Sequence, residues 1–382
     1  MAVYNERRSG YSPAKAYTPV HVATPTTEST RAGFGQPQLI FFCELNGPEL
    51  LTHLQHRAIM AHLAAHGYGL ALALRELDPP LVAAIQLLNQ HGIPVIAWLL
   101  LPPDEGLWFS LQNYPQALER YRQFRAWAHT HDLQFQAIGL DIEPPSSELD
   151  RLQRRGLRHL ARRFWLAREN VLYEAARAAY RELISAIHHD GYEVHTYQLP
   201  ILADDRRAGT TLAQRVLDIV DLPADVEVLI CYSSAPIAAL GDDLGGVLIT
   251  SYGPAADGIG VGVVSSSSIR DSSSEGLPPL TWEALERDLV LAAHYTDTIY
   301  VNSFEGCVER GLLARIATIN WEASPQVARW KQALVTTARA GLLASLLLAR
   351  FSNTLIAWLG WALFAMLLTR QLRATLQRRP RP

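Results

Sequence analysis

The chain has 382 residues, of which 49% are hydrophobic, so it can form one large domain with extensions or more than one average domain. Its formal net charge of −3 excludes a global basic field, and we expect no nucleic-acid partner. Its 3 cysteines show no CxxC spacing, which excludes a disulfide scaffold and argues against a structural zinc site.

Residues 1–36 are rich in Ser, Thr, Pro, Ala and Gly and show no apolar periodicity, which predicts a disordered N-terminal segment. No apolar stretch follows Arg7 and Arg8, so a secretory signal peptide is not expected.

From residue 38 onward, short apolar runs alternate with helical stretches, the pattern of repeated strand–helix units. The predicted strands are residues 38–44, 68–74, 94–101, 135–142, 193–199, 226–232, 247–252 and 298–304. The predicted helices are residues 48–66, 79–91, 115–131, 148–189, 211–220 and 282–294, with a closing helix near residue 309. Residues 253–274 are rich in Gly and Ser and include a possible hairpin extension at 259–264.

This near-strict alternation predicts an α/β fold, a single (β/α)8 TIM barrel over residues 37–328. A doubly wound open sheet is the alternative, but the Gly-rich phosphate turn typical of that fold is missing after the first strand. By strand phase, Cys43 and Cys231 should face the helix layer, and we expect Trp98 and His195 in the core.

Residues 329–382 form a hydrophobic helical segment with an Arg-rich tail. Phe351 to Leu368 carries no charge and is close to the minimum length of a membrane-spanning helix, while Ala333 to Ala349 is apolar except for Arg339. We favour a transmembrane hairpin, which would leave both barrel and tail in the cytoplasm by the positive-inside rule. A single span with the barrel outside, and a soluble helix pair packed on the barrel or a partner, are the alternatives. The protein is thus expected to be membrane-associated, with a cytoplasmic barrel.

Enzymes of this fold build their sites from residues at the carboxyl ends of the strands. In this chain those ends are crowded with acids and rings, which is typical of carbohydrate sites. The residues expected to bind substrate are Glu44, Asn46, Trp108, Tyr197, Gln198, Tyr232 and Tyr252. The expected catalytic residues are Asp141, Glu143 and Glu305.

The fourth strand is the most informative. Asp141 and Glu143 are two apart and so point to the same inward face, whereas Leu140 and Ile142 point to the helices. Two acids on one inward face disfavour each other's charge, which would keep a proton on one of them. A protonated Glu beside an ionised Asp is suited to general acid catalysis at a leaving oxygen.

The run Leu140-Asp141-Ile142-Glu143 resembles the end of the strand-four motif of the chitinase and endo-N-acetylglucosaminidase family of glycoside hydrolases. The resemblance implies that Glu143 is the general acid and that Asp141 orients the substrate's N-acetyl group, the internal nucleophile, with help from Tyr232. The two earlier aspartates of the motif are Gln136 and Gly139 here.

A second mechanism would pair Glu143 with Glu305. A carboxyl separation of about 5–5.5 Å would suit a retaining glycosidase, and about 6.5–9.5 Å an inverting one. Retaining barrels of this kind place their nucleophile on strand seven, where the predicted strand has Tyr252 and no acid.

The sequence thus favours a membrane-attached glycoside hydrolase-like barrel acting on a glycan or glycolipid, with no cofactor and no metal. One alternative is a non-catalytic carbohydrate-binding or scaffold barrel at the membrane. Another is a metal-dependent isomerase or lyase that uses Glu44, Glu143, His195 and Glu305 as ligands.

Overall fold

A computed structural model describes residues 36–145, 163, 167, 170–235, 243–265 and 277–377. The predicted disordered segment lies outside these residues except for its last position. The first half of the predicted helix 148–189 also lies almost entirely outside them.

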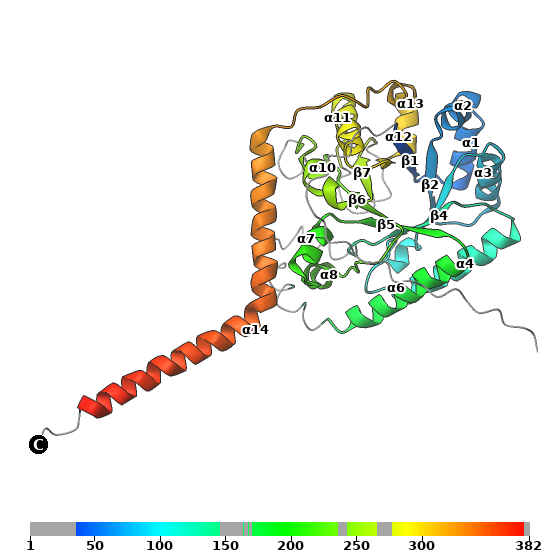
Figure 1. Cartoon of the computed structure of the whole chain (residues 1–382). Coiled ribbons are helices and arrows are strands. Elements are labelled where there is room, and N and C mark those ends of the chain that lie inside the picture. Colours follow the sequence, from blue (N-terminus) through cyan, green and yellow to red (C-terminus); the bar gives the residue numbers. More distant parts are fainter. Residues whose placement is uncertain are drawn as a thin grey trace, which may run out of the picture. The chain divides into compact units, whose positions relative to one another are not determined.

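Eight parallel strands close into a barrel in chain order, with the last strand paired to the first (Figure 1). The strands are β1 (Gln38–Cys43), β2 (Gly69–Leu74), β3 (Val95–Leu99), β4 (Ala137–Asp141), β5 (Glu193–Gln198), β6 (Val226–Ile230), β7 (Gly258–Gly262) and β8 (Thr298–Asn302). The predicted TIM barrel is therefore confirmed.

Helices connect consecutive strands and surround the barrel (Figure 1). The first group is α1 (Gly47–Leu54), α2 (Arg57–His66), α3 (Pro79–Gln90), η1 (Pro103–Glu105), α4 (Tyr114–Thr130) and α6 (Leu172–His189). The second group is α7 (Ile201–Ala208), α8 (Leu212–Leu217), α10 (Val247–Tyr252), η3 (Gly253–Ala255) and α11 (Trp282–Ala293). The chain ends with α12 (Phe304–Glu309), α13 (Leu312–Ile316) and α14 (Arg329–Gln377).

The seventh strand was placed wrongly by the sequence. Residues 247–252 form helix α10, and β7 is Gly258–Gly262, inside the stretch predicted as a loop with a hairpin extension. The β-branched composition of 247–252 suggested a strand, but tertiary packing overrides local propensity. In β7 the inward positions are glycines because the interior is already filled. A Cβ on Gly260 would lie 2.8 Å from Cδ1 of Ile230, and one on Gly262 would lie 2.8 Å from the carbonyl oxygen of Asn302.

Two apolar layers hold the fold together. The larger lies between the strands and the helices and includes Leu140, Ile142, Cys43 and Cys231, as their strand phase predicted. The smaller fills the barrel interior and includes Trp98.

The C-terminal segment forms one helix, α14, so the predicted hairpin of two helices is wrong. Arg350, expected to separate two helices, lies within it because arginine is a good helix former. By length and composition, the described part of the chain has one helix able to cross a membrane, Arg329–Ser352, and the shorter apolar stretch Thr354–Arg370 follows it.

Candidate functional site

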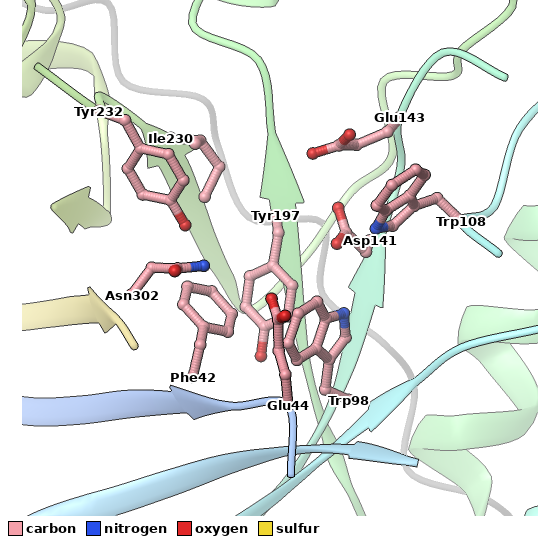
Figure 2. Close-up of a pocket in the computed structure, with 10 residues that line it drawn as sticks. All are labelled: Phe42, Glu44, Trp98, Trp108, Asp141, Glu143, Tyr197, Ile230, Tyr232 and Asn302. Carbon is pink, nitrogen blue, oxygen red and sulfur yellow. The ribbon is translucent and has the colours of Figure 1, made fainter. Parts of the chain in front are cut away.

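A pocket lies at the carboxyl ends of the strands, where the fold places catalytic and binding groups (Figure 2). Its lining combines acids from two strands with aromatic rings. The lining residues are Phe42, Glu44, Trp98, Trp108, Asp141, Glu143, Tyr197, Ile230, Tyr232 and Asn302. Six of the residues predicted for the site are therefore brought together: Glu44, Trp108, Asp141, Glu143, Tyr197 and Tyr232.

Backbone pairing beyond the end of β4 fixes the two central acids. The N–H of Phe109 donates to the carbonyl of Asp141 (3.0 Å), and the N–H of Glu143 donates to the carbonyl of Phe109 (3.1 Å). The strand thus continues past its last sheet residue, and Asp141 and Glu143 share one face, 5% and 6% exposed. Figure 2 shows both carboxylates beside Trp108.

The loop that carries Trp108 is held by one buried amide. The side-chain NH2 of Asn113 donates to the carbonyls of Trp108 (2.8 Å) and Glu105 (3.0 Å). Its oxygen accepts from the N–H of Ser110 (2.8 Å), whose carbonyl in turn accepts from the hydroxyl of Tyr180 (2.8 Å). These bonds fix the backbone on both sides of Trp108, so its ring is presented to the pocket by a firm loop.

Aromatic rings form the floor of the pocket. Phe42 and Trp98 lie edge-on to Tyr197, with ring centroids 4.7 and 6.0 Å away, and the Tyr300 ring lies 5.3 Å from that of Tyr197. A Cβ at Gly139 would collide with the hydroxyl of Tyr197. Tyr197 therefore fills the space below Asp141 that an aspartate at position 139 would need. An aspartate at position 139 would therefore not fit beside Tyr197 in this barrel.

Burial shifts the pKa values of the tyrosine and histidine side chains in and beneath the pocket floor. Burial, followed by the nearby Tyr300 and then Asp141, holds the pKa of Tyr197 well above its usual range, so this hydroxyl stays protonated. In the barrel interior beneath the pocket floor, Nδ1 of His195 contacts the hydroxyl of Tyr300. Burial lowers the pKa of His195, and Glu193, 3.7 Å away, only partly offsets this effect. Burial therefore favours the uncharged forms of both Tyr197 and His195.

The pocket is narrow. The free space among its lining side chains is about 30 Å³, which is room for only one or two water molecules. A ligand as large as a sugar would have to engage it from the mouth, where Glu143, Trp108 and Tyr232 lie (Figure 2).

Glu305 does not line this pocket. It lies in the first turn of α12 and is only 5% exposed, and its Oε2 has no hydrogen-bond partner in the described part of the chain. Burial raises the pKa of Glu305 above its ordinary value. The structure thus brings Glu44, rather than Glu305, into the pocket with Glu143.

Three further predicted residues lie elsewhere. Asn46 caps α1, where its side chain accepts from the N–H of Glu49 (3.0 Å). Gln198 is buried and donates to the hydroxyl of Thr196 (3.1 Å). Tyr252, at the end of α10, donates to Oδ2 of Asp204 (2.8 Å) in the outer layer.

Four lining residues were not among the residues predicted for the site: Phe42, Trp98, Ile230 and Asn302. A signal existed for two of them, since each shares the inward strand phase with a predicted site residue. Phe42 lies two before Glu44, and Ile230 two before Tyr232.

The ligand set proposed for a metal-dependent isomerase does not come together. Of its members, His195 lies in the barrel interior, and Glu305 lies outside the pocket. Among the described residues, no group of three or more His, Cys, Asp or Glu is arranged to hold a metal ion.

No protein-family model matches this sequence, and no curated protein matches it. Among solved structures, the PgaB (BpsB) glycoside hydrolase domain from Bordetella bronchiseptica is similar, at 11% identity and a TM-score of 0.45, over 76% of this chain and 100% of that one. A GH5-4 broad specificity endoglucanase from an uncultured bacterium matches at 11% identity and a TM-score of 0.39, over 72% and 85%. A D-allulose 3-epimerase from Methylomonas sp. matches at 11% identity and a TM-score of 0.37, over 71% and 85%.

A chitinase from Chromobacterium violaceum also matches, at 15% identity and a TM-score of 0.29, over 69% of this chain and 67% of that one. These neighbours include glycoside hydrolases and an epimerase. Likeness at this level reflects the barrel fold alone, and barrels host many chemistries. The site must therefore be argued from its own residues.

Proposed function

We propose that this protein is a membrane-attached glycoside hydrolase that acts on a glycan or glycolipid, with Glu143 as the general acid. One observation carries the proposal: Glu44, Asp141 and Glu143 converge with Trp108 and Tyr232 in a single pocket on the face where barrel enzymes place their chemistry. Glycosidic cleavage needs carboxyl groups on both sides of the scissile bond, or one carboxyl and an internal nucleophile.

Each group has a role in this proposal. Glu143, at the outer end of β4, protonates the leaving oxygen, and Trp108 beside it stacks on a sugar face. Burial keeps the hydroxyl of Tyr197, in the pocket floor, in its neutral form. Proton transfer by a positioned acid contributes about 10²- to 10⁴-fold to the rate.

The test is turnover of a panel of aryl glycosides by the wild-type protein and by Glu143→Gln. We expect the substitution to lower kcat/KM by at least about 100-fold on the substrate that is cleaved. The matched control is Glu76→Gln, an exposed carboxylate that follows β2 and does not line the pocket. Equal turnover by wild type and Glu143→Gln would remove the assignment.

Two mechanisms fit the proposed site, and the substrate separates them. If Asp141 orients an acetamido nucleophile, only N-acetylhexosaminides are cleaved, and Asp141→Asn loses most activity. If Glu44 is a carboxylate nucleophile, plain hexosides are cleaved too, and azide restores turnover to Glu44→Ala by displacing the aryl group to give the glycosyl azide of inverted anomeric configuration.

A non-catalytic sugar-binding barrel is the second candidate, and the narrow pocket favours it. It predicts that a glycan binds without turnover, that Glu143→Gln leaves the Kd unchanged, and that Tyr232→Ala weakens binding. Isothermal titration of each variant with the same oligosaccharide separates the two candidates.

A further inference from the structure

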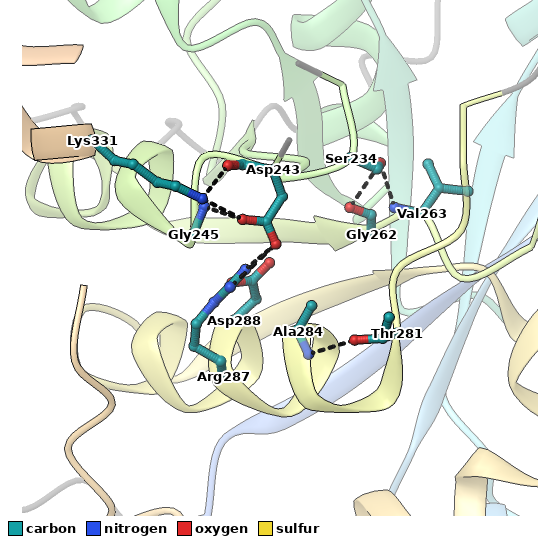
Figure 3. A network of polar contacts seen from close by, with 10 residues as sticks. All are labelled: Ser234, Asp243, Gly245, Gly262, Val263, Thr281, Ala284, Arg287, Asp288 and Lys331. Atoms are coloured by element: carbon teal, nitrogen blue, oxygen red, sulfur yellow. Dashed lines mark hydrogen bonds and ion pairs between the residues drawn. The ribbon is translucent and has the colours of Figure 1, made fainter. Parts of the chain in front are cut away.

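The first part of α14 lies against the barrel, and its cationic side chains bind acids there. Near its start, Nζ of Lys331 donates to the carbonyl of Asp243 (2.7 Å) and lies 3.3 Å from Oδ1 of the same residue. Asp243 is also bound by Arg287 of α11 (3.2 Å), which pairs with the buried Asp288 at 2.8 Å (Figure 3). This network ties α14, α11 and the chain before α10 together.

Arg339 makes the central contact. Its Nη2 lies 2.8 Å from Oδ1 of Asp204 in α7, a side chain that is almost completely buried. Its guanidinium also lies over the ring of Tyr252, 3.8 Å from the centroid, and it donates to the carbonyl of Ser251. Farther on, Arg350 donates to the carbonyl of Ala208 at the end of α7 (2.8 Å).

Apolar contacts fill the intervals between these cations. Val335 packs with Leu244 and Val247, and Leu346 packs with Ala208, Leu212 and Val216. We call the contact surface formed by Lys331, Val335, Arg339, Leu346 and Arg350 the docking seam. Moving this part of α14 into lipid would remove its cations from their partners, and unpaired cations in hydrocarbon are strongly disfavoured.

Beyond Ser352 the helix changes character. Every described side chain from Thr354 to Arg370 is exposed, and the stretch has no charge before Arg370. Ile356, Trp358 and Leu359 lie on different sides of the helix and are 66%, 71% and 70% exposed. A helix that is apolar on every side is stable only when it is surrounded by apolar material. A groove or a second copy would cover one side, whereas a bilayer covers all of them.

We propose that α14 is divided at Ser352: Thr354–Arg370 crosses the bilayer once, and Arg329–Ser352 stays in water as a strut that the docking seam holds on the barrel. At about 1.5 Å per residue the apolar stretch is about 25 Å long, and arginines at its end can extend to the headgroups. The inference rests on the membrane attachment in the proposed function and is independent of catalysis.

A single crossing has a topological consequence. It places the barrel and the Arg-rich tail on opposite sides of the bilayer. The positive-inside rule then assigns the tail to the cytoplasm and the barrel, with its pocket, to the other side. The strut keeps the barrel next to the membrane surface, so a glycan attached to a lipid is the substrate class that this arrangement fits.

Cysteine labelling tests the division. The full chain is added to preformed vesicles of phosphatidylcholine and phosphatidylglycerol, which leaves the barrel outside, and is treated with a membrane-impermeant maleimide. The native cysteines are buried, and the parent chain gives the background. Leu334→Cys and Ala340→Cys, exposed positions of the strut, should label freely. Leu359→Cys and Leu363→Cys should label about tenfold more slowly and reach full labelling only in SDS.

Ala374→Cys completes the design, because a single crossing predicts that it labels only after the vesicles are permeabilised. Shielding of positions 334 and 340 in vesicles that carry the protein would show that the whole helix is inserted and would overturn the division. Labelling of position 374 in intact vesicles would overturn the single crossing. Failure of the chain to float with the vesicles would instead overturn membrane attachment itself. Aryl glycoside turnover in detergent tests the proposed catalytic function separately, because it does not depend on any of these three results.

Discussion

Gly139 offers a direct test of the pocket floor, because the absence of its side chain leaves room for Tyr197. A Cβ at residue 139 would meet the Tyr197 hydroxyl and lie 2.8 Å from Cζ and 2.9 Å from Cε2 of that ring. Tyr197 is 1% exposed and has ring neighbours on several sides, so it has little freedom to withdraw. Overpacking of a filled core costs about 1–3 kcal/mol. We expect Gly139→Ala to lower the free energy of unfolding by about 2 kcal/mol.

Urea unfolding in a mild detergent measures this change. The matched control is Gly69→Ala in β2, where an added Cβ would meet no atom closer than 3.4 Å. The double variant Gly139→Ala/Tyr197→Leu should lose about 1 kcal/mol less unfolding free energy than the two single variants lose together. The reason is that the added methyl group then enters space vacated by the Tyr197 ring. If the Gly139 and Gly69 variants unfold alike, or if the effects of the Gly139 and Tyr197 changes add, Tyr197 does not occupy that space.

Three further predictions follow from particular contacts. Burial raises the pKa of Asp288 from 3.8 to about 6. The folded protein then holds this proton more tightly than the unfolded chain does. The free energy of unfolding should therefore fall by about 3 kcal/mol as the pH rises through the range between the two pKa values. In urea unfolding measured at a series of pH values, Asp288→Asn should reduce this pH dependence. Asn113→Ala should lower kcat/KM about tenfold, measured beside Trp108→Ala, because it frees the loop behind that ring. Glu44→Gln should lower kcat/KM at least about 100-fold, and Glu305→Gln less than about tenfold, in the same aryl glycoside assay, because only Glu44 lines the pocket.

The barrel was predictable because hydrophobic alternation repeats along the chain. The phase of β4 alone predicted that Leu140 and Ile142 face the helices and that Asp141 faces inward, and the structure agrees. Strand phase is a local property that a single sequence carries in full.

The seventh strand was not predictable in the same way. The run Gly258–Gly262 lacks inward side chains because neighbouring residues such as Ile230 already fill the interior. A strand whose inward positions are empty gives no alternating signal of its own, so it resembles a loop. Its neighbour at 247–252 has the composition of a strand but packs as α10 between the barrel and α14.

Of the two mechanisms predicted from the sequence, only the second used Glu305, as the partner of Glu143. The position of Glu305 follows from how β8 ends. The strand stops at Asn302, and Ser303 begins α12 by accepting from the N–H of Gly306 with its side chain. From that point strand alternation no longer applies, and Glu305 lies buried in the first turn of α12 and does not line the pocket. The strand-like phase of β1, in contrast, continues through Phe42 to Glu44 and delivers that carboxylate to the pocket. A serine before a new helical turn is a helix-start signal that the sequence does contain. A two-carboxylate mechanism in this pocket would therefore pair Glu143 with Glu44 rather than with Glu305.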